Sequence, residues 1–276
     1  MSNSQPVIES YSPAPVDKSR IAASFSRSAA SYDSVAQLQQ QVGNQLLEKL
    51  PKEFSAKTIL DAGCGTGYFT RELTRRFNPD QIYSIDLAAG MLSYAADKTT
   101  DADQARTHWA QTDVEHLPFA DNSFDLVYSS LVVQWCADLE AFFREAKRVL
   151  KPGGILVFST LGPRTLYELK QAWKPIDQHV HVNEFMPHQC VDQLLSGQSF
   201  TCTELSSEDI VLQYQRLNQL TKELKSLGAH NMNEQQSSGL TGKNRIKALI
   251  NNYEQFRSDD GILPATYEVY YGIALV

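Results

Sequence analysis

The chain has 276 residues, of which 42% are hydrophobic, and its formal net charge is −7. This length and composition fit one large soluble domain, because no run approaches the roughly 20 apolar residues that a membrane span needs. The negative charge argues against nucleic acid as the main partner, since phosphate binding needs a basic face. We therefore expect a cytoplasmic, monomeric globular protein that binds neither a membrane nor nucleic acid.

The four cysteines, at positions 64, 136, 190 and 202, form no CxxC pair and no metal-ligand spacing. No export signal is visible, so we expect reduced thiols, with Cys136 a small buried hydrophobe rather than a nucleophile. His179 and His181 are close in the chain, but no third ligand accompanies them at a suitable spacing. The sequence therefore predicts no metal site.

Residues 1–16 are rich in Ser and Pro and predict a disordered leader. The rest of the chain, 17–276, predicts one domain. Its first part, 17–50, has apolar residues at helical spacing until Pro51 and predicts two helices. These helices either pack on the core or form a flap over a ligand at the first strand, and we favour the N-terminal helical flap.

Residues 57–161 predict a core in which strands and helices alternate. Strands are expected at 58–61, 81–86, 107–111, 124–130 and 155–160. Helices are expected at 68–77, 90–98 and 139–150, the last stopped by the Lys-Pro-Gly-Gly run at 151–154. This alternation predicts a doubly wound, mostly parallel sheet that binds ligands at the carboxyl ends of its strands.

The alternation breaks down after residue 161. Helices are expected at 165–173, 188–195, 215–227 and 241–256, and two strand-like runs at 200–205 and 210–214. A β-rich segment at 266–275 closes the chain. We expect residues 162–262 to form a capping insertion and the edge of the sheet, and 263–276 to form the closing strand.

A glycine-rich turn follows the first predicted strand, in the order Asp61, Gly63, Gly65, Gly67. Glycine lets a ligand lie close to the backbone, because it has no Cβ. The D-x-G-x-G-x-G spacing differs from the G-x-G-x-x-G of dinucleotide sites, because its third glycine comes one residue early. The turn is either the floor of a different adenosine site or a plain strand-to-helix connection.

Acidic residues follow the next two predicted strands. Asp86 stands where a carboxylate would accept hydrogen bonds from both ribose hydroxyls of an adenosine, although a lone Asp there also caps helices. Asp113 stands where it would accept from an adenine amino group, although it also fits an ordinary loop. Neighbouring residues complete the predicted cofactor site: Cys64, Leu87, Met91, Val114, Ser130 and Leu131.

Gln134 and Trp135 follow the fourth predicted strand, where the donor and the acceptor of a transferred group would meet. They either line an acceptor pocket or pack on a short helix.

These motifs together resemble the shared core of the class I S-adenosylmethionine-dependent methyltransferases. The resemblance rests on Asp86 and on the runs 61–67, 113–119, 124–131 and 148–154. Further runs resemble the malonyl-[acyl-carrier protein] O-methyltransferases of biotin synthesis over nearly the whole chain: 25–30, 32–33, 38–39, 131–136, 168–173, 183–187, 227–230 and 263–268. The leader is the one departure.

The resemblance implies S-adenosyl-L-methionine as cofactor and methyl transfer to the free carboxylate of a malonyl thioester. A carboxylate is ionised at pH 7 and needs no general base. Tyr32 matches the family's Tyr-Asp position and is the candidate that orients the carboxylate, unless it is a core aromatic. The thioester is malonyl-acyl-carrier protein or malonyl-coenzyme A. Rivals are another small-molecule methyltransferase, acting on a quinone or a small acid, and a non-catalytic binding subunit.

Acyl carriers are acidic, so docking on this acidic chain needs a local basic surface. Two runs offer one. The first is Arg144, Lys147, Arg148 and Lys151, which the dipole of a helix C-terminus also explains. We favour the second for partner binding: Lys243, Arg245 and Lys247.

Overall fold

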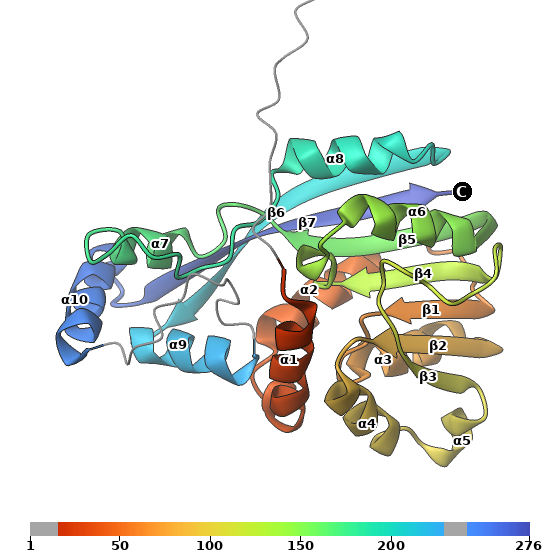
Figure 1. Cartoon of the computed structure of the whole chain (residues 1–276), viewed down its shortest axis with the longest axis horizontal. Coiled ribbons are helices and arrows are strands. Elements are labelled where there is room, and N and C mark those ends of the chain that lie inside the picture. Colours follow the sequence, from red (N-terminus) through yellow and green to blue (C-terminus); the bar gives the residue numbers. More distant parts are fainter. Residues whose placement is uncertain (1–15, 229–241) are drawn as a thin grey trace, which may run out of the picture.

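The computed structural model describes residues 16–228 and 242–276, so nearly all of the predicted leader lies outside the described residues. Its strands are β1 Thr58–Ala62, β2 Gln81–Asp86, β3 Thr107–Gln111, β4 Phe124–Ser130, β5 Leu150–Leu161, β6 Cys202–Tyr214 and β7 Leu263–Leu275. They form a seven-stranded sheet of order β3-β2-β1-β4-β5-β7-β6 (Figure 1). The first five strands of this order are parallel, and β7 is antiparallel to β5 and β6. The predicted fold class is confirmed.

The helices flank and extend this sheet. They are α1 Lys18–Tyr32, α2 Gln37–Glu48, α3 Tyr68–Phe77, α4 Ala89–Asp97, α5 Asp101–Gln104, α6 Leu139–Val149, α7 Tyr167–Trp173, α8 His188–Gly197, α9 Leu217–Ser226 and α10 Lys243–Tyr253, with short 3₁₀ turns η1 Val133–Trp135 and η2 Glu254–Phe256. Among the described helices, none is both long enough and apolar enough to cross a bilayer.

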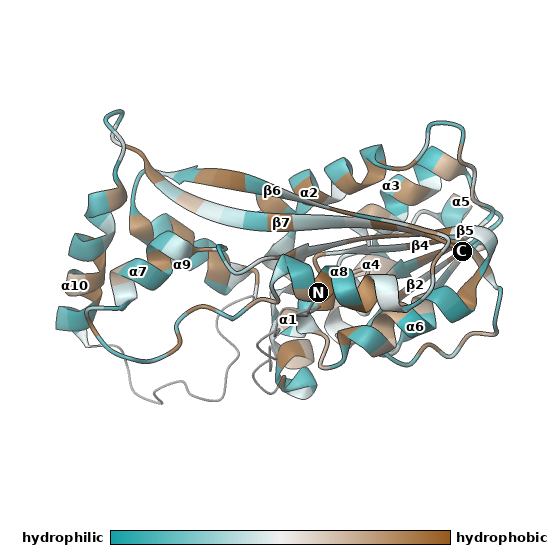
Figure 2. Ribbon diagram, turned by 90° about the horizontal axis from the view of Figure 1, so that it is seen from above, coloured by the Kyte–Doolittle hydropathy of each residue, from teal (hydrophilic) through white to brown (hydrophobic). Residues whose placement is uncertain are grey.

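The central strands of the sheet are buried on both faces. Helices α2 and α3 cover one face, and α6 and α8 cover the other (Figure 2). Successive residues of a strand point to opposite faces. Ile59 therefore packs with α2, whereas Leu60 packs with α6, and Val157 and Phe158 divide in the same way. Burial on both faces explains why the strands read as continuous apolar runs.

The last two strands, β6 and β7, continue beyond the rest of the sheet. Helices α7, α9 and α10 gather at this extension and form what we call the lobe (Figure 1). Tyr253 of α10 ties the lobe to β7, because its hydroxyl donates to the carbonyl of Pro264 at 2.8 Å. The lobe lies beyond the carboxyl end of β5. In sheets of this kind ligands bind at the carboxyl ends of the parallel strands.

Two predicted boundaries are wrong. The Lys-Pro-Gly-Gly run does not end α6 as a loop, because β5 already begins at Leu150. Its Gly153 N–H donates to the carbonyl of Val276 at 2.8 Å, which extends the sheet. The two strand-like runs at 200–205 and 210–214 are one strand, β6. Its polar middle misled the prediction, since an edge strand exposed to solvent tolerates polar residues.

Candidate active site

The carboxyl ends of β1, β2 and β4 surround a pocket of about 110 Å³, which we call the strand-end pocket. Gly63 and Gly65 have φ angles of 82° and 53°, in the left-handed region that favours glycine. A Cβ on Gly63 would lie 2.2 Å from Val132 Cγ2, whereas one on Gly65 would meet nothing within 4 Å. At Gly65 the loop therefore presents bare backbone to open space, as a cradle for a ligand requires.

Asp86 holds this loop as well as lining the pocket. Its two carboxylate oxygens accept from the N–H groups of Gly65 at 2.9 Å and Ala88 at 2.7 Å. Burial raises the pKa of Asp86, and these backbone hydrogen bonds oppose the rise. Asp86 therefore lines the pocket and holds the glycine loop, but it does not cap α4, whose N-cap is Ala88 with no side-chain capping hydrogen bond.

Nine of the predicted cofactor residues line the strand-end pocket: Gly63, Gly65, Asp86, Leu87, Met91, Asp113, Val114, Ser130 and Leu131. Asp61, Cys64 and Gly67 lie next to it but are not on its wall. Thr70 donates a 2.6 Å hydrogen bond to Asp61. Burial raises the pKa of Asp61 to about 7, the Thr70 hydrogen bond opposes this, and the charge of Asp86 adds to it.

Helix α1 closes the pocket through Lys18, which sequence reasoning missed. Its Nζ lies 2.5 Å from Asp113 Oδ2 and 2.6 Å from Glu115 Oε1. Glu115 is only 4% exposed and also accepts from the N–H of Ala137 at 2.7 Å. Desolvation acts to lower the pKa of Lys18, but the hydrogen bonds to the two acids outweigh it and raise the pKa. The cation therefore stays charged and pins α1 over the pocket.

Three aromatic residues stand where this pocket meets a second one, and with Leu131 they line both: Phe25, Tyr32 and Trp135. We call these three the aromatic collar. The Phe25 ring meets Tyr32 edge-on at 6.3 Å between centroids and Trp135 at 5.6 Å. Burial raises the pKa of Tyr32, and the charges of Asp86 and Asp33 add to the rise. Its hydroxyl therefore remains a hydrogen-bond donor at neutral pH.

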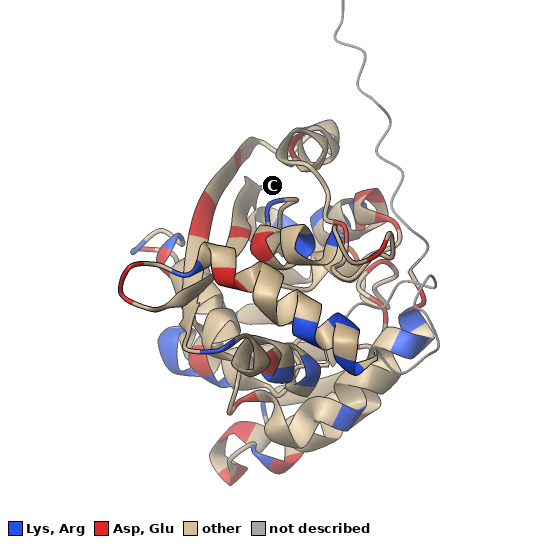
Figure 3. Ribbon diagram, turned by 90° about the vertical axis from the view of Figure 1, so that its left-hand side faces the viewer, with Lys and Arg blue, Asp and Glu red and all other residues tan. Residues whose placement is uncertain are grey.

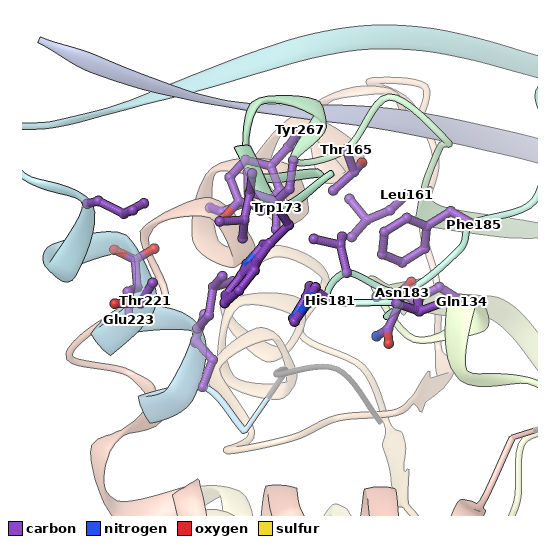
Figure 4. A pocket seen from close by; sticks show the side chains of 18 of the residues that line it. Gln134, Leu161, Thr165, Trp173, His181, Asn183, Phe185, Thr221, Glu223 and Tyr267 are labelled. Atoms are coloured by element: carbon purple, nitrogen blue, oxygen red, sulfur yellow. The ribbon is translucent and has the colours of Figure 1, made fainter. Parts of the chain in front are cut away.

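The second pocket, the lobe cavity, has a volume of about 530 Å³ and lies between the sheet and the lobe (Figure 4). The predicted acceptor residues Gln134 and Trp135 line it from η1. Thr221 and Glu223 of α9 lie on the side opposite Gln134. Among the described residues that line it, none is Lys or Arg. Its walls are mostly apolar, with a few hydrogen-bonding groups, as is usual for a ligand site.

The basic residue Arg245 of α10 is already engaged, because its guanidinium pairs with Asp177. Lys243 and Lys247 of the same helix are exposed. Figure 3, which views this end of the molecule, shows Lys and Arg on its helices together with Asp and Glu. Of the three basic residues predicted to bind the partner, Lys243 and Lys247 are therefore the exposed ones.

Three residues of the other basic run make contacts within the fold. Lys147 donates to the carbonyls of Gln198 and Ser199, each at 2.6 Å, and Arg148 Nη2 lies 2.8 Å from Glu145. Lys151 lies 2.8 Å from Asp125. These contacts agree with the view that this run needs no partner to explain it. Within the described ranges, no three His, Cys, Asp or Glu side chains gather as a metal site would require.

Residues 60–158 match the family described as "Methyltransferase domain". The chain is 46% identical to the biotin biosynthesis bifunctional protein BioHC of Cellvibrio japonicus, over 93% of this chain and 50% of that protein. It therefore spans about half the length of that relative. It is 41% identical to the malonyl-[acyl-carrier protein] O-methyltransferase of Hahella chejuensis, over 92% of this chain and 89% of that protein.

Among solved structures, the YcgJ protein of Bacillus subtilis superposes with a TM-score of 0.60 at 17% identity. The match covers 86% of this chain and 97% of that one. At this identity the likeness establishes a shared fold and no more.

Proposed function

This chain belongs to the family of malonyl-[acyl-carrier protein] O-methyltransferases, and from that premise we propose that it transfers a methyl group to the free carboxylate of a malonyl thioester. The product is the methyl ester that primes pimeloyl synthesis for biotin. The methyl donor is S-adenosyl-L-methionine, which supplies an electrophilic methyl group on a sulfonium sulfur. The acceptor is malonyl-acyl-carrier protein, with malonyl-coenzyme A as the smaller alternative.

One observation carries the proposal: two pockets of different chemistry meet at the aromatic collar. The strand-end pocket is lined by Asp86 and Asp113, whose carboxylates suit the hydroxyl and amino groups of an adenosine. The lobe cavity is mostly apolar and carries no described Lys or Arg on its wall. A cationic donor and an anionic acceptor are therefore held apart until their reacting ends reach the collar.

The collar residues would do the catalytic work by orientation. The acceptor carboxylate is already ionised, so no base is required; a C–O bond forms as the C–S bond breaks in line. The Tyr32 hydroxyl, protonated at neutral pH, would donate to one carboxylate oxygen and aim the other. Phe25 and Trp135 would exclude water, which otherwise solvates the carboxylate and weakens its attack.

Hydrogen bonds of residues near Tyr32 in the chain help to fix its position. Asp33 accepts a 2.6 Å hydrogen bond from the Thr66 hydroxyl, which joins the end of α1 to the glycine loop. Ser26 of α1 accepts from the N–H of Gly90 at 3.1 Å. These contacts hold α1, and with it Tyr32, over the strand-end pocket.

The test is mass spectrometry of malonyl-carrier protein after incubation with the protein and the methyl donor. We expect a gain of one methyl group that mild alkali removes, which marks an ester. A methyl group stable to alkali would indicate carbon or nitrogen methylation and another small-molecule acceptor. No gain, together with tight donor binding, would favour a non-catalytic binding subunit.

A further inference from the structure

We propose that the lobe cavity binds the pantetheine arm of the thioester, with Gln134 and His181 accepting hydrogen bonds from the amide N–H groups of that arm; this inference rests on the proposed function. The first reason is size. A cavity of about 530 Å³ falls in the range that encloses a drug-sized ligand. A malonyl group alone has far too few atoms to fill it, whereas the arm that carries it is long, flexible and rich in CH₂ groups.

Gln134 supplies the second reason. Its Nε2 donates to the carbonyl of Leu131 at 2.8 Å, so the orientation of its amide is fixed. Its Oε1 is then left buried, with no hydrogen-bond partner in the described part of the chain. An unpaired buried acceptor costs about 1–3 kcal/mol, and a ligand N–H that reaches it recovers this energy. Gln39 of α2, on the same cavity, has its Oε1 in the same condition.

His181 presents a second acceptor. Its Nε2 lies 2.7 Å from Asp177 Oδ1, and Arg245 pairs with the other oxygen of that carboxylate. The imidazole therefore donates through Nε2, which leaves the lone pair on Nδ1. The ring stacks on Trp173, with centroids 3.7 Å apart and planes 8° apart, which fixes its position on the cavity wall (Figure 4). Burial and the nearby His179 lower the pKa of His181, so the neutral form prevails.

These acceptors set the direction in which the substrate lies. An ionised carboxylate is itself only an acceptor, so it gains nothing from Gln134 Oε1 or His181 Nδ1 and would turn to the Tyr32 hydroxyl at the collar. Amide N–H groups are donors and match the cavity wall. The two amides of a pantetheine arm would thus lie along the cavity, with the acid at the collar.

We expect the arm to enter the cavity beside α10. Ile246 and Ile250 of this helix line the cavity and are 41% and 40% exposed. They lie one turn apart on one face of the helix. An arm that enters here would leave its carrier outside, next to α10. The same chemistry occurs in carrier-bound and coenzyme-bound thioesters, so both substrates would use this site.

The test compares two acceptors, malonyl-pantetheine and a malonyl S-alkyl thioester without amides. Gln134→Met keeps the size of the side chain and removes the acceptor, and His181→Phe keeps the stack on Trp173. In the wild type we expect a higher kcat/KM for malonyl-pantetheine, and in each variant we expect this preference to fall about tenfold. Gln41→Met, an exposed glutamine of α2, is the matched control and should keep the preference.

A binding measurement separates this inference from the reaction. Unacylated pantetheine should bind the wild type in the presence of S-adenosylhomocysteine and bind both variants about tenfold more weakly. Methylation of both thioesters with an unchanged preference and unchanged pantetheine binding in the two variants would overturn the arm site. Pantetheine binding that depends on Gln134 and His181, without any methylation, would support the arm site and overturn the proposed reaction.

Discussion

The strand-end pocket and the lobe cavity share a wall but differ in how they are built. The strand-end pocket is made from turns at the ends of the parallel strands β1 to β4, where Asp86 is tied to backbone N–H groups and Lys18 pairs with Asp113 and Glu115. The lobe cavity is made from helix faces and loops, and its His181 is held from behind the wall by Asp177, which also pairs with Arg245.

The two regions also differ in charge. Asp61 and Asp86 are buried beside or on the strand-end pocket, and burial raises the pKa of each. Such carboxylates gain stability when a cation arrives. The lobe cavity has no described cation on its wall and offers acceptors instead. If the proposed function holds, the donor site is fixed by the core of the fold, whereas the choice of acceptor belongs to the lobe.

The largest expected effect tests the charged side of this comparison. Asp86→Ala removes a carboxylate that both lines the pocket and holds Gly65. Hydrogen bonds to charged groups contribute about 1.5–3 kcal/mol, so the affinity for S-adenosylmethionine should fall roughly 10- to 150-fold. Isothermal calorimetry measures it. Asp80→Ala, an exposed acid just before β2, is the control and should bind normally. Unchanged affinity in a folded Asp86→Ala variant would remove Asp86 from the site.

The strand-end pocket was predictable because the residues that form it lie close together in the sequence. The glycine loop and Asp86 belong to one strand–turn–helix–strand unit, and the parallel sheet brings their ends together. Lys18 was not predictable, because 95 residues separate it from Asp113 and no local pattern marks it. The contact exists only once α1 lies across the strand ends.

The lobe cavity resisted prediction for the same reason. The sequence indicated Gln134 and Trp135, since they follow a strand of the regular core. His181 stands out in the sequence only as an incomplete metal ligand. Its role depends on the Trp173 ring and on Asp177, which helix periodicity does not place. Likewise, Arg245 looks free in the sequence, because the acid that pairs with it lies 68 residues away.

The next prediction concerns the collar between the two regions. Tyr32→Phe keeps the ring and its contact with Phe25 and removes only the hydroxyl. Turnover should fall about tenfold or more, the scale of a lost orienting hydrogen bond, while the melting temperature barely changes. Tyr94→Phe is the control, because Tyr94 packs on the same cluster of Ala88 and Met91 but lines neither pocket. Full activity in Tyr32→Phe would make Tyr32 a packing residue.

A smaller effect concerns Asp61, beside the strand-end pocket, and the dependence of stability on pH. The Asp61 pKa of about 7 lies above the value of about 3.9 for an exposed Asp, so between them the folded protein holds a proton that the unfolded chain has lost. Stability should therefore fall as pH rises through this window, by up to about 1.4 kcal/mol per pH unit from this group. Urea unfolding at pH 5, 6 and 7 should give a shallower slope for Asp61→Asn. Equal slopes in both proteins would contradict the raised pKa of Asp61.

The smallest effect tests whether the lobe also receives the carrier. We expect the exposed Lys243 and Lys247 to meet an acidic carrier, while Arg245 stays with Asp177. Exposed ion pairs contribute about 0.2–1 kcal/mol each, so replacing both lysines by Glu should raise KM for malonyl-carrier protein about fivefold at low salt. The effect should shrink as ionic strength rises, because exposed charges are screened.

The control for this docking experiment has the same charge change elsewhere. Lys52→Glu with Arg76→Glu alters two exposed cations that line neither pocket, so KM should not change. Malonyl-coenzyme A provides the second control, because it lacks the acidic carrier and should lose much less with Lys243→Glu and Lys247→Glu. Equal losses on both thioesters would mean that the lysines act on the cavity itself. In that case the lobe would bind only the pantetheine arm, and the carrier would dock elsewhere.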